Sequence, residues 1–361
     1  MAPAFAHDVV IGVTNPVTGR PSESHVYVKG AIDLAVEEIN AEGGILVGGE
    51  RHKLRIQLED DACRPAVGVS AVRRLISKYK VPVILGSYCS SVTLAEMRVT
   101  QQNQVPQITS ISVNPKITAS GNKWMFRNKE TSTMRANALV GHVIESLKIK
   151  TIGMIAVNDD YGRGSVKKFS AKFEENGVDV LAKEYYLAES EDFVAQLTAI
   201  KAKNPEALYL VSRAIPTCIQ LIKQARQLGY KTLIASTGCA QDEVARGGEA
   251  VNGVWVVTAF EANQKDPMVQ EFVKKFRAKV GRNPNFLSAP TYDAIYVIAR
   301  AMERANTTTD RAKIRDAIAE TRMKGVYSYP GHMLYFDENG QAPVRPGLAR
   351  FEKGQRTIIY Q

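Results

Sequence analysis

The sequence predicts an α/β protein made of two doubly wound lobes with parallel-rich sheets. Short apolar, β-branched runs of strand length alternate with helical segments along almost the whole chain. This alternation is typical of parallel sheets covered by helices. The same order of elements occurs twice at similar length, over residues 9–127 and 134–259. A chain of 361 residues is also long enough for two medium-sized domains. We therefore expect two similar lobes with a cleft between them.

The first half of the chain opens with an apolar strand and an amphipathic helix. The strand covers 9–14, and a polar loop separates it from a helix over 28–40, in which Ile32, Val36 and Ile39 share one face. The later elements of this half are a strand over 53–59, a turn over 60–65, a helix over 66–79, a strand over 81–85, a helix over 92–100, a strand over 107–110, a loop over 111–118 and an extended piece over 124–127.

The second half repeats this pattern and ends in strands. A helix over 134–147 precedes a strand over 151–157, and the turn 158–162 leads into a helix over 163–176. The elements that follow are strands over 179–186, 207–211, 232–235 and 254–259, helices over 193–203, 216–228, 267–280, 289–305 and 311–320, and terminal strands over 333–336, 348–351 and 357–360.

Charge and hydropathy exclude several classes of function. The net charge is +10, but Lys and Arg are spread along many helices, and no arginine-rich arm or basic–aromatic repeat concentrates them. A solvated basic surface explains this pattern better than nucleic-acid binding does. No apolar run approaches the roughly 20 residues that span a bilayer. We therefore expect neither a nucleic-acid partner nor direct membrane insertion.

The N-terminus and the cysteines indicate export. Ala4-Phe5-Ala6 has the small-x-small form of a secretory cleavage site. We interpret residues 1–6 as the remnant of a signal peptide cleaved after Ala6, with a chance match as the alternative. Four cysteines, an even number, fit an oxidising compartment, and none has the CxxC spacing of a zinc site.

Motifs for catalysis are missing from the sequence. It contains no GxxxxGK[ST], HExxH or GxSxG motif, and its five histidines are scattered without metal spacing. No pair of acidic residues stands out as general acid and base, and the Asp60-Asp61 pair is more simply a polar turn at a strand end. We therefore expect a binding protein without cofactor or metal, rather than an enzyme that uses the cleft.

The stretch over 81–97 predicts a small-molecule site. An apolar strand ends at Gly86-Ser87, and Ser90, Ser91 and Thr93 are residue types that begin helices. The end of such a strand faces the crevice where α/β sheets bind ligands. Free N–H groups at a helix start, with serine hydroxyls, favour a carboxylate. The alternative is an ordinary turn with a serine cap.

A set of short segments, in the right order over nearly the whole chain, carries a family resemblance. The segments are 11–12 with 16–19, 30–44, 60–65 (DDACRP), 86–91 (GSYCSS), 126–127, 158–162 (NDDYG) and 224–229 (QARQLG). With them the chain resembles the periplasmic solute-binding proteins of the leucine/isoleucine/valine-binding family, which serve branched-chain amino-acid-type ABC transporters. The resemblance implies a type I periplasmic binding fold, in which two Rossmann-like lobes are hinge-linked by three crossovers. Lobe one would comprise 7–129 with 262–331, and lobe two 130–261 with 332–361.

The resemblance also implies roles for residues of both lobes. Tyr88, Cys89 and Ser90 match the ligand loop of lobe one, where a serine hydroxyl and a backbone amide hold the ligand carboxylate. Ile111 and Val113 match positions that line the pocket opposite this loop.

Further matches concern a disulfide and an aromatic residue. Cys63 and Cys89 match the disulfide of lobe one, with two free buried thiols as the alternative. Tyr161 matches an aromatic residue on the lobe-two side of the cleft. Spacing alone leaves open whether Cys218 and Cys239 form a second disulfide or are free thiols.

Departures from the family pattern concern the ligand. Amino-acid binders of this family have a threonine where this chain has Val113, and an acidic partner for the ligand ammonium where it has Gly238. An unpaired ammonium in a closed cleft would cost several kcal/mol. We therefore expect an aromatic or other non-amino carboxylate, of benzoate or phenylpropanoid type, with a branched-chain amino acid as the alternative.

Several side chains are candidates for binding the rest of this ligand. Arg213 follows a strand of lobe two and is suited to pair with a carboxylate or a ring hydroxyl, with an exposed strand-end arginine as the alternative. Ile215 adds apolar surface, and Arg20 and His25 in the first loop are weaker candidates.

We expect a monomeric periplasmic protein that closes around its ligand by hinge motion and presents it to a membrane ABC permease. A ligand-sensing domain of the same fold is the alternative from another class.

Overall fold

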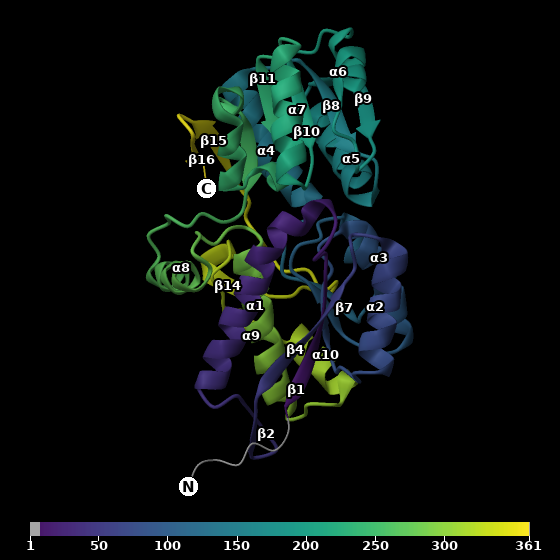
Figure 1. Ribbon diagram of the computed structural model, residues 1–361, viewed down its shortest axis with the longest axis vertical. Helices are drawn as coiled ribbons and strands as arrows, with labels where there is room; N and C mark the ends of the chain where they lie inside the picture. The colour runs from purple at the N-terminus through teal and green to yellow at the C-terminus, as the bar shows by residue number, and fades with distance from the viewer. Residues whose placement is uncertain (1–7, 361) are drawn as a thin grey trace. The chain divides into compact units, whose positions relative to one another are not determined.

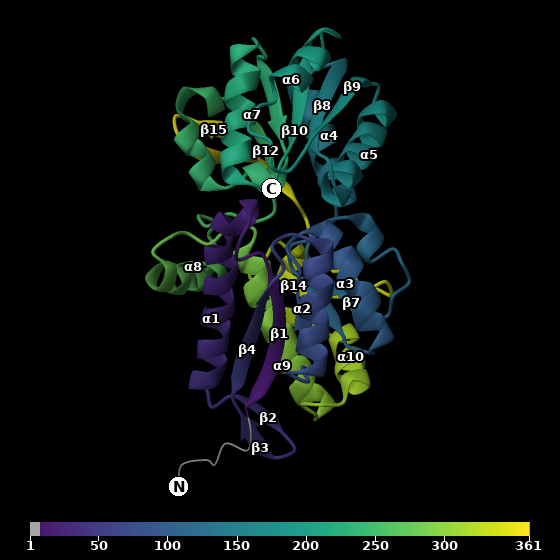
Figure 2. The same ribbon diagram turned by 45° about the vertical axis from the view of Figure 1, so that its right-hand side comes forward.

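A computed structural model divides the chain into two compact units, shown in Figures 1 and 2. It describes residues 8–360, apart from the side chains of Arg20, His142, Thr237, Ile358 and Tyr360. Unit 1 contains the chain up to Lys129 and Phe260–Val344, and unit 2 contains Glu130–Ala259 and the chain from Arg345 on. The chain therefore passes between the units three times. The proposed signal-peptide remnant, 1–6, lies outside the described residues.

Unit 1 is a parallel sheet with helices on both faces. The strands are arranged in the order β4-β1-β5-β6-β7 and are all parallel. They are β1 (Val9–Asn15), β4 (Leu54–Asp60), β5 (Ile84–Leu85), β6 (Gln107–Thr109) and β7 (Met125–Arg127). The helices α2 (Pro65–Ser77) and α3 (Ser90–Gln102) pack together, as do α1 (His25–Ala41) and α9 (Ser288–Ala305). The strand order reverses next to β1, which places the carboxyl ends of β1 and β5 at a switch point.

Smaller elements complete unit 1. Helices α8 (Pro267–Val280) and α10 (Arg311–Ala319) pack against α1 and α9 respectively. Strands β2 (Ile45–Val47) and β3 (Glu50–His52) form a hairpin that the hydropathy pattern does not predict. Its turn consists of Gly48 and Gly49, which have φ of 62° and 83° and suit a tight left-handed turn. The remaining elements are β13 (Arg322–Lys324), β14 (Met333–Tyr335), η1 (Arg20–Ser24), η2 (Pro115–Ile117) and η5 (Pro330–His332).

Unit 2 has a larger sheet with the order β16-β15-β12-β11-β10-β8-β9. Its parallel strands are β8 (Thr151–Val157), β9 (Asp179–Tyr186), β10 (Ala207–Val211), β11 (Thr232–Ala235) and β12 (Trp255–Thr258). The hairpin β15 (Gly347–Glu352) and β16 (Gln355–Tyr360) adds to one edge in antiparallel fashion. The helical elements are α4 (Ser132–Leu147), α5 (Asp160–Glu175), α6 (Val194–Lys201), α7 (Ile215–Gln227), η3 (Thr237–Cys239) and η4 (Asp242–Val251). The α/β fold with two parallel-rich sheets is thus confirmed.

Helix starts depend on local capping groups. The Asp266 carboxylate accepts hydrogen bonds from the N–H groups of Met268 and Val269 at 2.9 and 3.1 Å, and Pro267 follows at the first helical position. Asp159 caps α5 in the same way, since its Oδ1 accepts from Gly162 N at 2.9 Å. Several helices begin earlier than predicted, among them α1 at His25 rather than 28, α3 at Ser90 rather than 92, and α5 at Asp160 rather than 163.

The division between the units differs from the expected one at residues 260–261 and 332–344, which all belong to unit 1. Strand β14 pairs with β13 of unit 1. Farther along, Arg127 N donates to Gly340 O at 2.8 Å and Ala342 N donates to Arg127 O at 2.8 Å, so this segment extends the edge of the unit 1 sheet at β7. The chain therefore leaves unit 1 after Val344 rather than after 331.

Within the described part of the chain, no helix combines the length and apolarity needed to cross a membrane.

Candidate functional site

The start of helix α3 in unit 1 presents free backbone N–H groups. Its N-cap residue is Cys89, and no side chain caps the helix there. The first helical hydrogen bond runs from Thr93 N to Cys89 O at 2.9 Å, so the N–H groups of residues 90–92 precede the helical ladder. Together with the helix dipole, these groups favour an anion.

Ser90 adds a hydroxyl to this helix start. The side chain is buried, and its Oγ accepts hydrogen bonds from Val113 N and Asn114 N, both at 3.3 Å. Because a hydroxyl has two acceptor positions and one proton, Ser90 retains its proton for donation. The structure thus places Val113 next to Ser90, and Val113 is only 2% exposed.

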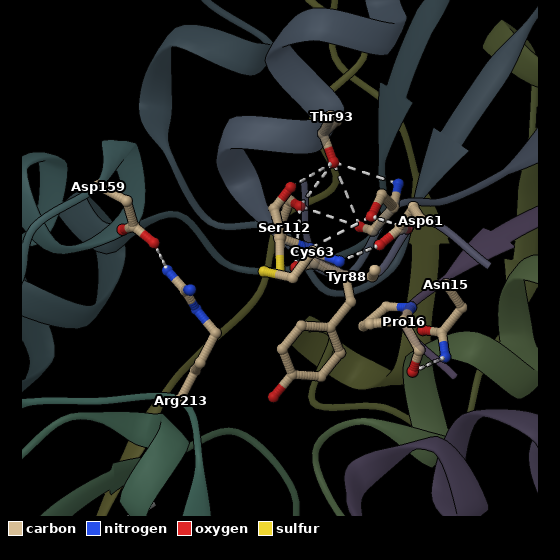
Figure 3. Close-up of a disulfide and its surroundings, with 12 residues drawn as sticks. Asn15, Pro16, Asp61, Cys63, Tyr88, Thr93, Ser112, Asp159 and Arg213 are labelled. Atoms are coloured by element: carbon tan, nitrogen blue, oxygen red, sulfur yellow. Dashed lines mark hydrogen bonds and ion pairs between the residues drawn. A yellow bond between two sulfur atoms is a disulfide. The ribbon is translucent and has the colours of Figure 1, made fainter. Parts of the chain in front are cut away.

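Hydroxyl groups hold the loop that leads to Ser90. Ser87 O accepts hydrogen bonds from Thr109 Oγ1 at 3.0 Å, from Ser112 Oγ at 3.0 Å and from Thr93 Oγ1 at 3.3 Å. Ser112 Oγ also bonds to Thr93 Oγ1 at 2.7 Å, as Figure 3 shows. The sequence analysis missed Thr109 and Ser112. The sequence feature that could have pointed to them is the run of Ser and Thr residues between 109 and 112.

Two buried carboxyl groups lie behind this loop. Asp61 is 0% exposed, and its carboxylate accepts from Ser87 Oγ at 2.6 Å and from Cys63 N at 2.7 Å. Burial raises the pKa of Asp61 to about 6. Asp61 is therefore not the simple polar turn residue that the sequence suggested, because its carboxylate fixes two loops from inside the unit.

Glu96 of α3 is the second of these groups and is also 0% exposed. Its Oε2 accepts from Thr14 Oγ1 at 3.1 Å and from Gln107 Nε2 at 3.0 Å. Burial raises the pKa of Glu96 well above its usual range, and the charge of Asp61 raises it further. Burial and the charge of Asp61 thus both favour the protonated form of Glu96.

A disulfide joins Cys63 to Cys89, with the two Cα atoms 5.6 Å apart (Figure 3). This is the pairing that the resemblance implies. It ties the turn after β4 to the N-cap of α3. In unit 2, Cys218 and Cys239 form a second disulfide, also with a Cα–Cα distance of 5.6 Å, which settles the question that their spacing left open.

The other predicted ligand-binding residues of unit 1 differ in burial and in their contacts. Tyr88 is buried in the same loop as Ser90, and Ile111 is half-buried after β6. His25 begins α1, and its Nδ1 lies 2.8 Å from Asn15 Nδ2. Burial and the charge of Lys29 lower the pKa of His25. The Arg20 side chain lies outside what the structure describes.

Unit 2 brings Tyr161, Arg213 and Gly238 together at the carboxyl ends of its central strands. Tyr161 OH donates to Ser236 Oγ at 3.1 Å, and the Arg213 guanidinium lies over the Tyr161 ring, 5.1 Å from its centroid. Arg213 also forms an ion pair with Asp159 (Figure 3). The Arg213 side chain is 11% exposed, so it is not the exposed strand-end arginine of the alternative interpretation.

Gly238 allows two backbone segments to approach closely. A Cβ atom at this position would lie 2.0 Å from Ser212 O and 2.7 Å from Arg213 Cα. No acidic side chain fits here without a shift of the backbone. Ile215, the remaining candidate, is the first residue of α7 and is 2% exposed. The sequence analysis missed Asp159 and Ser236, which complete this cluster.

Within residues 8–360, no group of three or more His, Cys, Asp or Glu side chains is placed to bind a metal. The polar groups described above can instead bind a small organic anion in unit 1 and donate or accept hydrogen bonds in unit 2.

Comparisons with known proteins show which proteins this chain is similar to. The family model described as "Periplasmic binding protein" matches residues 8–355. An "Amino acid binding protein" of Pseudomonas aeruginosa is 32% identical over 312 residues, which cover 85% of this chain and 81% of that protein. The crystal structure of a leucine binding protein, LivK, from Thermotoga maritima superposes with a TM-score of 0.88 at 30% identity and covers 97% of both chains. A solute binding protein of an ABC transporter from R. palustris, solved in complex with benzoate, has a TM-score of 0.87 at 17% identity and covers 98% of this chain and 96% of that chain.

Proposed function

This chain belongs to the periplasmic binding protein family, and on that premise we propose that it is the extracytoplasmic solute-binding component of an ABC importer. The family consists of binding proteins rather than enzymes. Two disulfides in the described chain support a location in an oxidising compartment. In this role the protein acts as a monomer that delivers one small ligand to a membrane permease.

The start of α3 supports a carboxylate as the group that the protein recognises. Ser90 accepts two backbone hydrogen bonds and keeps its proton, next to the N–H groups of an uncapped helix start. This single observation carries the proposal, because a carboxylate accepts several such bonds at once and benefits from the helix dipole.

Relatives favour an α-amino acid with an apolar side chain as the ligand. The Pseudomonas aeruginosa relative, at 32% identity, is an amino acid binding protein, and the Thermotoga maritima structure, at 30%, is a leucine binding protein. The half-buried Ile111, two residues before Val113, provides apolar surface in the segment next to Ser90 that suits such a side chain.

A second candidate ligand is an aromatic carboxylate of benzoate or phenylpropanoid type. It is favoured by Gly238, where the backbone of Ser212 leaves no room for an acidic partner of an ammonium group. The R. palustris protein that binds benzoate is similar at 17% identity, which is a likeness of fold. The amino acid is therefore the better supported ligand, and the aromatic acid is the one to test beside it.

Thermal-shift screening after native mass spectrometry tests this function. Mass spectrometry identifies any ligand that co-purifies, and the ligand-free protein is then heated with leucine, isoleucine, valine, benzoate or cinnamate. A ligand that binds the folded state raises Tm in proportion to its occupancy. We expect a rise with the apolar amino acids. A rise with benzoate or cinnamate alone would assign the aromatic ligand, and no shift with any carboxylate would contradict the proposal.

A further inference from the structure

Asp159 of unit 2 is placed to bind a charged ligand group, although nothing in its local sequence distinguishes it from Asp160. It lies two residues after the end of strand β8, and the carboxyl ends of parallel strands are the edge of a sheet where ligands bind. Its side chain is 19% exposed. The carboxylate therefore remains accessible while most of its surface is covered.

Both oxygens of Asp159 are held in place by the protein. Oδ1 accepts from Gly162 N at 2.9 Å, and Oδ2 is paired with the Arg213 guanidinium. A carboxylate has about four acceptor positions, so these two contacts leave acceptor capacity for a ligand. The contacts also fix the orientation of the carboxylate before any ligand arrives, which lowers the entropy cost of binding.

The surroundings of Asp159 suit an ammonium group. The Arg213 guanidinium lies over the Tyr161 ring, 5.1 Å from its centroid, and this contact helps to hold the arginine beside Asp159. Asp159 and Arg213 together are neutral, and an amino-acid zwitterion is neutral as well, so the bound state adds no net charge. At Gly238, by contrast, a side chain would collide with the backbone of residues 212–213.

We propose that Asp159 binds the ammonium group of an α-amino-acid ligand and that Arg213 and Gly162 position its carboxylate for that contact. This inference rests on the proposed function, because it takes an amino acid to be the ligand. It assigns to this chain an acidic partner at the start of α5 instead of at position 238.

The test is the Asp159→Asn variant, measured with leucine and with its des-amino analogue, 4-methylpentanoate. Asparagine is as good a helix cap as aspartate, so the variant removes the charge and keeps the cap. Isothermal titration calorimetry gives Kd for both ligands. We expect the affinity for leucine to fall by about 30-fold or more, as for truncated charge pairs, and that for 4-methylpentanoate to change by less than about threefold. If Asp159 had only a structural role, the substitution would weaken the binding of both ligands equally.

Asp160→Asn is the matched control, since it removes the same charge from the exposed neighbouring residue. We expect it to bind leucine like the wild type. Equal leucine affinity of Asp159→Asn and wild type would overturn the inference and leave the proposed function intact. A wild-type protein that binds benzoate but no amino acid would overturn the inference and keep the carboxylate site. A wild-type protein that binds no carboxylate would overturn both.

Discussion

Ser87 Oγ donates a hydrogen bond to Oδ2 of Asp61 at 2.6 Å, and both residues are almost completely buried. A carboxylate inside unit 1 therefore holds the loop from which α3 begins. Burying a charge is costly even when it is hydrogen-bonded. This cost appears in the pKa of Asp61, which burial raises to about 6 from its usual 3.8.

Asp61→Asn should alter how stability depends on pH. Because the pKa of Asp61 is raised by folding, the unfolded chain loses its proton first as the pH rises. The wild type therefore becomes less stable relative to the variant between about pH 4 and 6, and the difference is constant above that range. Over this range we expect the free energy of unfolding of the wild type to fall by roughly 2–3 kcal/mol relative to that of the variant. Urea unfolding at pH 4, 5, 6 and 7 measures it.

Asp60→Asn provides a control with the opposite sign. Although burial alone would raise the pKa of Asp60, hydrogen bonds from Thr18, Ala62 and Val17 lower it overall. The wild type should therefore lose stability relative to Asp60→Asn as the pH falls toward the pKa of Asp60. If both variants showed the same pH dependence, the assignment of the raised pKa to Asp61 would be wrong.

Ser90→Ala should weaken ligand binding. The change removes the hydroxyl proton that we assign to the ligand carboxylate, and a hydrogen bond to a charged group contributes roughly 1–3 kcal/mol. Calorimetric titration with the ligand found by the screen measures the change in Kd. Ser70→Ala on the exposed face of α2 is the control and should bind normally. An unchanged Kd for Ser90→Ala would show that this hydroxyl does not contact the ligand.

Much of the fold could be predicted from the sequence because its signals are local. The alternation of strands and helices and the serine-rich helix start at Ser90 are both visible within short windows. Short windows of sequence could not predict which side chains contact one another at the candidate site. Thr14 and Glu96 are 82 residues apart, and Arg213 and Asp159 are 54 apart. Only the packing of elements that are distant in the sequence brings such residues together.

The boundary near 331 was missed for a related reason. Residues 332–344 include no long periodic element, and their place in unit 1 depends on contacts with Arg127, more than 200 residues earlier in the chain. Contacts of this kind leave no pattern in the local sequence.

Replacing Cys63 and Cys89 with serine should reduce both stability and ligand affinity. The disulfide closes a loop of 26 residues, and removing such a link typically costs about 2–4 kcal/mol. It also frees the N-cap of α3, so the N–H groups beside Ser90 lose part of their fixed orientation. Thermal unfolding and calorimetric titration of the double variant measure the two effects. A loss of stability with unchanged Kd would show that the disulfide does not order the ligand loop.

Gly238→Ala should destabilise unit 2 strongly, because its Cβ would lie 2.0 Å from the backbone oxygen of Ser212. Neither backbone segment can move freely, since Cys239 is bonded to Cys218 and Ser236 N donates to Leu210 O at 2.8 Å. We expect a loss of roughly 1–3 kcal/mol, as for other overpacked sites, measured by urea unfolding. Gly141→Ala is the matched control, because a Cβ there meets nothing within 4 Å and alanine favours the helix by up to about 1 kcal/mol. A Gly238→Ala variant as stable as Gly141→Ala would mean that the Ser212–Arg213 backbone can retreat, and then the argument that position 238 cannot hold an acidic side chain would fail as well.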